Sequence, residues 1–153
     1  MRLLRLTLAF VLACLAFQAP AQLKLRTTEL RVAGPALKVE IAAKEADQMR
    51  GLMYRAKLGK DDGMVFVYED LAYLSMWMKN TLIPLSVAFV ADDGTILNIL
   101  DMEPQTEDSH MSAGPARYAI ETNKGWFAGN KIKAGDRVTG LPKPTKPPPA
   151  KAG

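Results

Sequence analysis

The chain has 153 residues and a formal net charge of +4, and 24% of its residues are charged. The excess positive charge lies at the two ends, in Arg2 and Arg5 and in Lys143, Lys146 and Lys151, where no acid accompanies it. Between these ends the chain carries 15 basic and 16 acidic residues, so no basic face remains to neutralise phosphates. We therefore expect no nucleic-acid partner.

A signal peptide is predicted at residues 1–21. Arg2 and Arg5 give it a positive start, Leu6–Phe17 is almost entirely apolar, and residues 19–21 (Ala-Pro-Ala) form a small-residue cleavage site. The apolar run is too short to span a bilayer. We expect a periplasmic or secreted protein with no stable membrane span once the signal is removed. The alternative is lipoprotein processing, which would anchor the chain through Cys14.

Cysteine usage limits the chemistry of the mature protein. Cys14 is the only cysteine and falls inside the predicted signal, which excludes disulfides, thiol catalysis and cysteine-ligated metals. Residues 22–141 are predicted to form a single β-rich domain, since about 120 residues can build a sufficient core. Residues 142–153 are rich in proline and lysine and predict a disordered, extended tail. We expect a monomer.

In the first half of the domain the spacing of apolar residues is first that of strands and then that of a helix. Residues 23–32 alternate weakly between apolar and polar, Gly34-Pro35 is a turn, and residues 37–41 alternate cleanly, as in a strand with one wet face. The period then becomes helical, and the apolar face consists of Ala42, Ala46, Met49 and Met53.

The second half predicts strands separated by turns. The predicted strands are 64–68, 73–78, 85–89, 96–100, 117–122 and 137–141. Asp92-Asp93-Gly94 predicts a hairpin with glycine in the left-handed region. Residues 102–114 lack periodicity and predict a surface loop, and residues 125–130 predict a helical turn or loop. The fold class is mostly β (β-rich α+β), a small antiparallel barrel-like or sandwich domain with one short helix.

A polar corner interrupts the apolar run between residues 76 and 84. Lys79, Asn80 and Thr81 place an ammonium, an amide and a hydroxyl between two segments that are expected to be buried. This pattern is typical of a well-made turn, and equally of a binding corner on a rigid scaffold. Trp77, two residues before Lys79, and Trp126 are candidate ligand platforms, although tryptophan more often packs in the core.

Two further charged residues lie in apolar surroundings. Arg50 follows the apolar face of the predicted helix, and Glu121 interrupts the apolar strand at 117–122. A buried carboxylate needs a cation or several donors, so the simplest expectation is that Glu121 pairs with Arg50 or Lys79. A solvent-facing position for Glu121 is the alternative, and it is the commoner one for a carboxylate on a strand.

The sequence assigns no metal and no cofactor. His110, with Glu103, Glu107 and Asp108 nearby, forms an acidic loop without the ligand alternation of a calcium site. Methionines around the central segments allow a soft-metal site, although gap-filling in the core is the commoner role; they are Met49, Met53, Met64, Met76 and Met78. Neither a nucleophile elbow nor a phosphate-binding glycine motif is present.

Four motifs together resemble a known family. They are Arg50-Gly51-Leu52-Met53, Gly63-Met64-Val65-Phe66, the run from Trp77 to Pro84 and the run from Glu121 to Phe127. In this order they resemble the family called domain of unknown function 192, over about Val39 to Val138. The resemblance implies a small β-rich domain, often exported, with no established activity. The family's arginine, Lys-Asn-Thr and strand glutamate match Arg50, residues 79–81 and Glu121.

These observations favour an exported binding or accessory module for an unknown small ligand or protein. Its candidate ligand-binding residues are Arg50, Trp77, Lys79, Asn80, Thr81, Glu121 and Trp126, and no residue is assigned as catalytic. The alternative is a small hydrolase or lyase that uses Glu121 and Lys79 in a pocket. The two readings differ in geometry, because catalysis requires these side chains to converge on an open cleft.

The export signal leads to a direct prediction. N-terminal sequencing of the exported protein should begin at Gln22, because cleavage follows the small residue Ala21. A lipid-modified Cys14 at the N-terminus would show instead that the lipoprotein pathway processes the chain.

Overall fold

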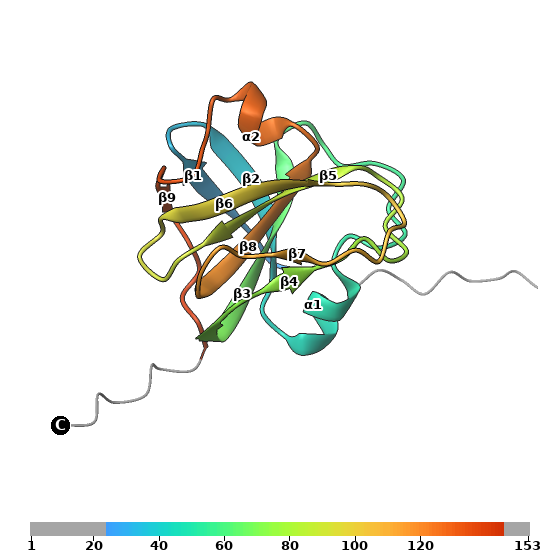
Figure 1. Ribbon diagram of the computed structural model, residues 1–153, viewed down its shortest axis with the longest axis horizontal. Helices are drawn as coiled ribbons and strands as arrows, with labels where there is room; N and C mark the ends of the chain where they lie inside the picture. The colour runs from blue at the N-terminus through green and yellow to red at the C-terminus, as the bar shows by residue number, and fades with distance from the viewer. Residues whose placement is uncertain (1–23, 146–153) are drawn as a thin grey trace, which may run out of the picture.

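The computed structural model describes residues 24–145 (Figure 1). The predicted signal peptide and residues 146–153 of the predicted tail lie outside the described residues. Within them the strands are β1 (Thr27–Val32), β2 (Ala36–Ala42), β3 (Asp62–Ala72), β4 (Ser75–Met76), β5 (Leu85–Val90), β6 (Ile96–Met102), β7 (His110–Met111), β8 (Ala116–Asn123) and β9 (Val138–Thr139). The helices are α1 (Glu45–Arg50) and α2 (Trp126–Gly129). No helix in this part of the chain is long and apolar enough to cross a membrane.

One curled sheet carries the fold. Its strand order is β6-β5-β8-β3-β2-β1-β9, and β4 pairs with β7 in a separate two-stranded sheet. Figure 1 shows the large sheet curling around the centre of the molecule, with α2 at one end and α1 at the other. The predicted fold class, mostly β with a barrel-like sheet, is confirmed. The segment predicted as a helical turn or loop contains α2, so the domain has two short helices instead of one.

The sheet is antiparallel except at one place. β2 and β3 pair in parallel, with Val39 opposite Gly63. A parallel pair needs a crossover of a dozen or more residues. Residues 43–61 supply it, and they include α1. The predicted helix therefore connects two parallel neighbours across one face of the sheet.

Apolar residues pack on both faces of the central strands. Leu30, Ile120 and Phe127 belong to one cluster, together with the inward-facing residues Val32 of β1 and Leu37 and Val39 of β2. Phe66, Phe89 and Met78 belong to the cluster on the other face. β5 and β8 are buried along nearly their whole length, since both faces are covered. This explains why β5 is apolar at all positions except Ser86, whereas β8 also buries the polar residues Arg117, Glu121 and Thr122.

The predicted hairpin at residues 92–94 is confirmed. β5 and β6 pair antiparallel, and Gly94 has a φ of 89°, in the left-handed region. A Cβ at this glycine would lie 2.5 Å from the carbonyl oxygen of Val138, so both conformation and space require glycine here.

The predicted strand at residues 73–78 is largely wrong. Only β4 is a strand there, and it pairs with β7, which lies inside the segment predicted as a loop. Backbone hydrogen bonds hold the following turn instead, from the Met78 amide to the Thr106 carbonyl (3.0 Å) and from the Thr81 amide to the Met78 carbonyl (3.1 Å). Long-range pairing with residues 103–111 thus replaces the expected two-strand corner.

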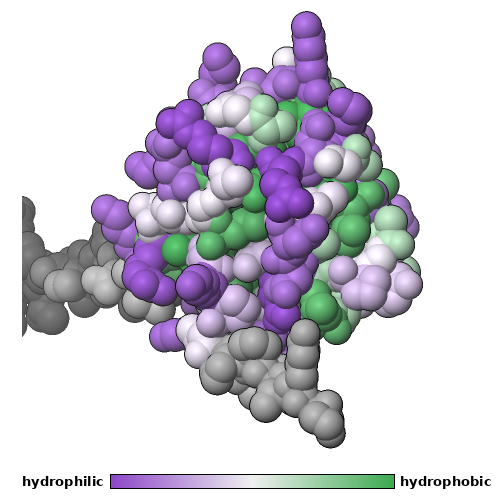
Figure 2. Space-filling view, turned by 90° about the vertical axis from the view of Figure 1, so that its left-hand side faces the viewer, coloured by the Kyte–Doolittle hydropathy of each residue, from purple (hydrophilic) through white to green (hydrophobic). Residues whose placement is uncertain are grey.

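The surface at the left of Figure 1 mixes residue types. Figure 2 shows hydrophilic side chains over much of this face, with smaller hydrophobic areas between them.

At the C-terminal end of the described chain, the Thr145 hydroxyl donates to Glu69 Oε1 at 2.7 Å.

Close backbone contact between β3 and β8 makes Gly63 intolerant of a side chain. A Cβ at Gly63 would lie 2.5 Å from the Glu121 carbonyl oxygen, and relieving this clash requires the strands to shift. Gly63→Ala should lower the free energy of unfolding by about 1–3 kcal/mol, measured by chemical denaturation. Gly129→Ala is the matched control, because its Cβ meets nothing within 4 Å and its effect should stay within about 0.5 kcal/mol.

Candidate functional site

Glu121 lies on the central strand β8 and is almost completely buried. It sits opposite Met64 on β3 and opposite Val87 on β5. Only 4% of the residue is exposed. By strand alternation its side chain shares the face of Ala119, which belongs to the cluster that contains Phe66 and Met78. The sequence-based alternative, a solvent-facing Glu121, is therefore wrong.

No cation accompanies this carboxyl group. Among the described residues the Glu121 side chain makes no hydrogen bond and no ion pair. Its carboxyl oxygens keep some accessible surface at the cavity that Glu121 lines, since the fully enclosed side-chain atoms without a partner are Arg55 Nε and His110 Nδ1. Burial raises its pKa from an ordinary 4.5 to about 8, since desolvation penalises the charged form. Glu121 is therefore mostly protonated, and neutral, at pH 7. The pKa of Tyr68 is raised to about 12, first by burial and then by the nearby charge of Glu121 when that group ionises.

The Glu121 side chain lines a small cavity of about 30 Å³. Arg50, Trp77 and Thr81 from the predicted site line the same cavity. They reach it from separate parts of the chain, because Arg50 ends α1 and the other two flank the turn after β4. We call this space, with its lining residues, the Glu121 cavity. Gln48, Met49, Gly51, Leu52, Met53, Phe66 and Met76 complete its lining.

The predicted pairing of Glu121 with Arg50 or Lys79 does not form. Lys79 does not line the cavity and pairs with Glu107, with 3.4 Å from Nζ to Oε1. Its ammonium also lies 5.2 Å from the centroid of the Trp77 ring, a cation–π contact. The turn after β4 projects Lys79 towards residues 103–109. The sequence pattern could not predict that Lys79 lies near these residues, because its position depends on the long-range backbone hydrogen bonds of the turn.

The other two predicted site residues do not line the Glu121 cavity. Asn80 adopts a left-handed φ of 53°, and its carbonyl oxygen accepts a hydrogen bond from the Tyr54 amide at 2.9 Å. Its backbone therefore has a structural role. Trp126 packs in the cluster on the opposite face of the sheet, and its indole nitrogen donates to Asp61 Oδ1 at 3.0 Å. The ring of Trp126 also meets Phe127 edge to face.

The acidic loop at residues 103–110 is engaged with cations of the protein itself. Glu103 pairs with Lys124, and Glu107 pairs with Lys79. His110 on β7 is half-buried, and its Nδ1 is buried with no partner. Within residues 24–145 no three His, Cys, Asp or Glu side chains are grouped so that they can hold a metal ion.

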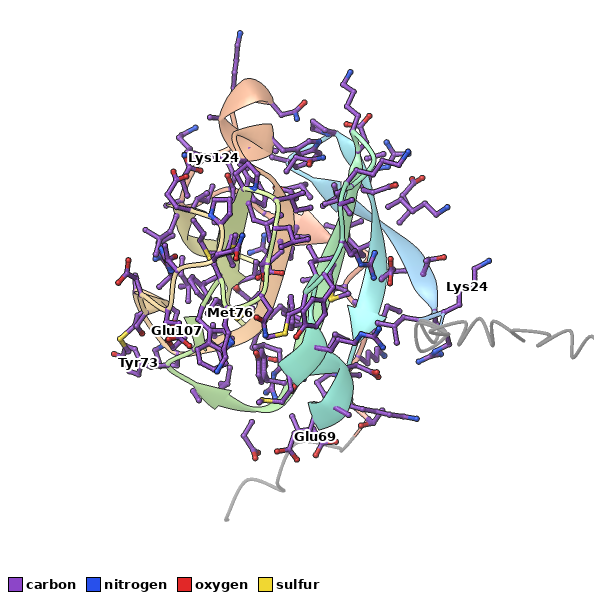
Figure 3. All side chains as sticks on the ribbon, turned by 90° about the vertical axis from the view of Figure 1, so that its right-hand side faces the viewer. Lys24, Glu69, Tyr73, Met76, Glu107 and Lys124 are labelled. Carbon is purple, nitrogen blue, oxygen red and sulfur yellow. The ribbon has the colours of Figure 1, made fainter. Side chains whose placement is uncertain are left out.

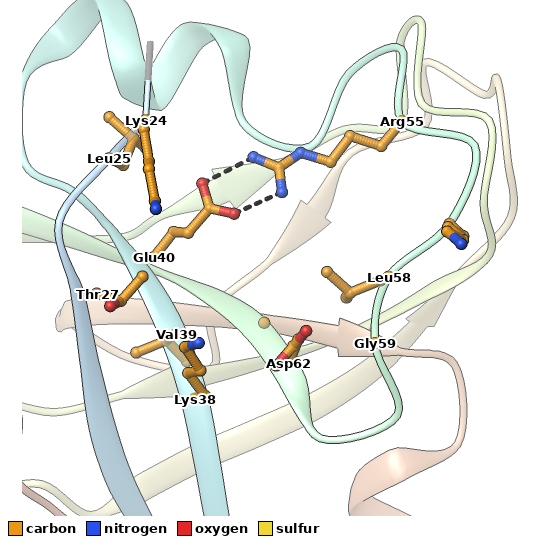
Figure 4. Close-up of a pocket in the computed structure, with 12 residues that line it drawn as sticks. Lys24, Leu25, Thr27, Lys38, Val39, Glu40, Arg55, Leu58, Gly59 and Asp62 are labelled. Carbon is orange, nitrogen blue, oxygen red and sulfur yellow. Dashed lines mark hydrogen bonds and ion pairs between the residues drawn. The ribbon is translucent and has the colours of Figure 1, made fainter. Parts of the chain in front are cut away.

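Sequence reasoning missed a second and larger cavity, of about 480 Å³, beside β1 and β2 (Figure 4). Its wall carries a two-pronged ion pair, in which Arg55 donates to both carboxylate oxygens of Glu40 at 2.6 and 2.8 Å. Glu40 in turn raises the pKa of Arg55. The alternation of β2 predicts that Glu40 faces solvent. Arg55 lies in a segment without regular secondary structure, so no periodicity in the sequence predicts that it pairs with Glu40.

Comparison with known proteins places this chain in a family. The fold and site define a small β-rich domain with a desolvated carboxyl group at a cavity. The family model of domain of unknown function 192, described as an uncharacterized family, matches residues 28–140. The chain therefore belongs to the DUF192 family, as its motifs indicated. No curated protein matches it.

Two solved structures resemble the chain closely enough to share its fold. A protein of unknown function from Novosphingobium aromaticivorans is 35% identical, with a TM-score of 0.72 over 74% of this chain and 85% of that one. A protein from Sinorhizobium meliloti, proposed to be a transcription regulator, is 33% identical, with a TM-score of 0.73 over 76% of this chain and 95% of that one. Neither supplies an established activity.

The raised pKa of Glu121 predicts a specific pH dependence of stability. The folded state holds this proton more tightly than the unfolded state, so the stabilisation present below about pH 4.5 is lost as the pH rises towards 8. The Glu121→Gln variant lacks this titration. Between about pH 5 and 9 it should gain on the order of 4 kcal/mol relative to the parent.

Chemical denaturation at a series of pH values measures this difference. Glu107→Gln is the control, because it removes an exposed carboxylate and should leave the shape of the stability curve nearly unchanged. Parallel curves for the parent and Glu121→Gln would contradict a raised pKa at Glu121.

Proposed function

We propose that this domain is a binding module whose ligand occupies the Glu121 cavity. The observation that carries the proposal is the burial of an ionisable group without a partner. A buried carboxyl group that makes no hydrogen bond costs stability, and an apolar side chain in its place would not. Such groups are typical of functional sites, where the bound ligand supplies the hydrogen bond or the opposite charge that the buried residue lacks.

The lining of the Glu121 cavity suits a small polar group or an ion. A volume of about 30 Å³ holds one water-sized guest, so a larger ligand would insert only one end. Glu121 can accept or donate a hydrogen bond when neutral, and it can balance a positive charge when ionised. Trp77 is 43% exposed and Met49 is 61% exposed, so both offer apolar surface to the rest of such a ligand.

A catalytic function receives less support. The hydrolase or lyase interpretation requires Lys79 beside Glu121, and Lys79 is instead paired with Glu107 outside the cavity. A single carboxyl group with a pKa of about 8 can transfer a proton near neutral pH, but the cavity lining presents no nucleophile beside it other than the Thr81 hydroxyl, which donates to the Lys79 carbonyl at 3.2 Å. Binding therefore remains the favoured function.

The proposal includes the cellular location of the domain. The predicted signal peptide supports a periplasmic or secreted binding module, with anchoring through Cys14 as the alternative. The near balance of acidic and basic residues argues against carrying over the transcription-related description of the Sinorhizobium meliloti relative, because DNA binding depends on a basic surface.

A thermal-shift screen tests the binding function. The panel should contain small amides, amines, alcohols and carboxylates together with monovalent and divalent metal ions. At least one member should raise the melting temperature of the parent and of Glu107→Gln but not of Glu121→Gln, because binding to the native state alone is stabilising. If every hit stabilises Glu121→Gln as strongly as the parent, the ligand binds elsewhere and the proposal fails.

A further inference from the structure

Methionine side chains gather around Glu121. Met49, Met53 and Met76 line the Glu121 cavity, and Met64 lies directly opposite Glu121 on the neighbouring strand β3. The chain has eight methionines in all, so half of them surround one carboxyl group. Methionine fills gaps in many cores, but gap-filling does not explain why the group at the centre is an unpartnered acid.

Met76 is buried, and it lines the same cavity as this acid. Met76 is 8% exposed, and the Tyr68 hydroxyl approaches its Sδ at 3.9 Å. Tyr68 and Met64 alternate on the same strand, so they share the face of the sheet that carries Glu121. Figure 3 shows Met76 among the side chains packed near α1, while Glu107 and Tyr73 lie to one side.

The size of the cavity limits what these groups can hold. About 30 Å³ accommodates a bare ion or a single water molecule and excludes an organic ammonium group with several carbon substituents. The ion must also tolerate Arg50, which lines the same cavity and makes no ion pair among the described residues. A monovalent cation is repelled less by this guanidinium group than a divalent one.

The chemistry of the lining selects among monovalent ions. Thioether sulfur is a soft, uncharged ligand that favours Cu(I), whereas K⁺ and Na⁺ prefer oxygen. One carboxylate then balances the charge of one monovalent ion, so the ion and Glu121 together are neutral, and the buried acid gains the partner that it lacks. Met49 is largely exposed, which places it at the mouth of the cavity, where it can close over an ion.

We propose that the Glu121 cavity binds a soft monovalent metal ion, Cu(I), through the thioethers of Met53 and Met76 and the carboxylate of Glu121. Met49 supplies a third thioether at the mouth. This inference rests on the proposed function and names the ligand class of that same cavity. Binding displaces the proton of Glu121 and involves no change in the oxidation state of the metal.

Silver(I) is the probe for the test, because it has the same charge and ligand preference and is stable in air. All measurements use the purified protein with Cys14→Ser, which removes the only thiol and so excludes metal binding by cysteine. Isothermal titration should show one Ag(I) per chain and no comparable binding of K⁺ or Zn²⁺. In the same sample the methyl carbon resonances of Met53 and Met76 should shift on binding.

Three variants locate the ion. Met53→Leu with Met76→Leu keeps the core volume nearly constant and should weaken Ag(I) binding at least a hundredfold. Glu121→Gln should weaken it at least tenfold. Met111→Leu is the control, because this methionine is 52% exposed on β7 and does not line the cavity, so the affinity should not change.

The outcomes separate this inference from the proposed function. Absence of Ag(I) binding by the parent, or an unchanged affinity in the double methionine variant, overturns the metal site. If the double variant does not fold, unshifted methyl resonances of Met53 and Met76 in the parent overturn it equally. Another outcome is that the parent does not bind Ag(I) while another compound of the screening panel stabilises the parent but not Glu121→Gln. That result would overturn the metal site and leave the proposed binding function intact.

Discussion

The burial of β8 along nearly its whole length is the constraint on which the site depends. The strand runs between β5 and β3, both faces are covered by apolar clusters, and seven of its eight residues are buried. Any ionisable group on β8 must therefore lose its water. Glu121 does so without a cation, and its carboxyl group consequently stays protonated at neutral pH. The chemistry of the domain thus follows from the position of one residue in the strand order.

The cavity over Glu121 exists because segments far apart in the sequence close over that face of the sheet. The turn after β4 is tied by backbone hydrogen bonds to the Thr106 carbonyl and, through the Asn80 carbonyl, to the Tyr54 amide. These bonds bring Trp77 and Thr81 to the same space as Arg50 at the end of α1. They are made by the backbone, so they fix the outline of the cavity largely independently of the side chains that line it.

Local sequence patterns predicted the strands and turns that depend on periodicity and turn residues. Alternation found β2 and β5, the short apolar stretch at residues 118–120 marked β8, and Asp92-Asp93-Gly94 found the hairpin, because period and turn chemistry are short-range properties. They also singled out Arg50, Trp77, Thr81 and Glu121, which line one cavity. The pairing of β4 with β7, the parallel β2–β3 pair and the position of Lys79 outside the Glu121 cavity were missed, since each depends on contacts between distant segments.

The central claim is that Glu121 is a buried, protonated carboxyl group with no partner in the ligand-free protein. Its side-chain carboxyl carbon, observed by NMR in protein labelled at glutamate, reports the titration of this group directly. The account predicts a single transition with a midpoint near pH 8, displaced well above the ordinary glutamate value of 4.5. A midpoint near the ordinary value of 4.5 would contradict the account, because it would require water or a cation beside the carboxylate.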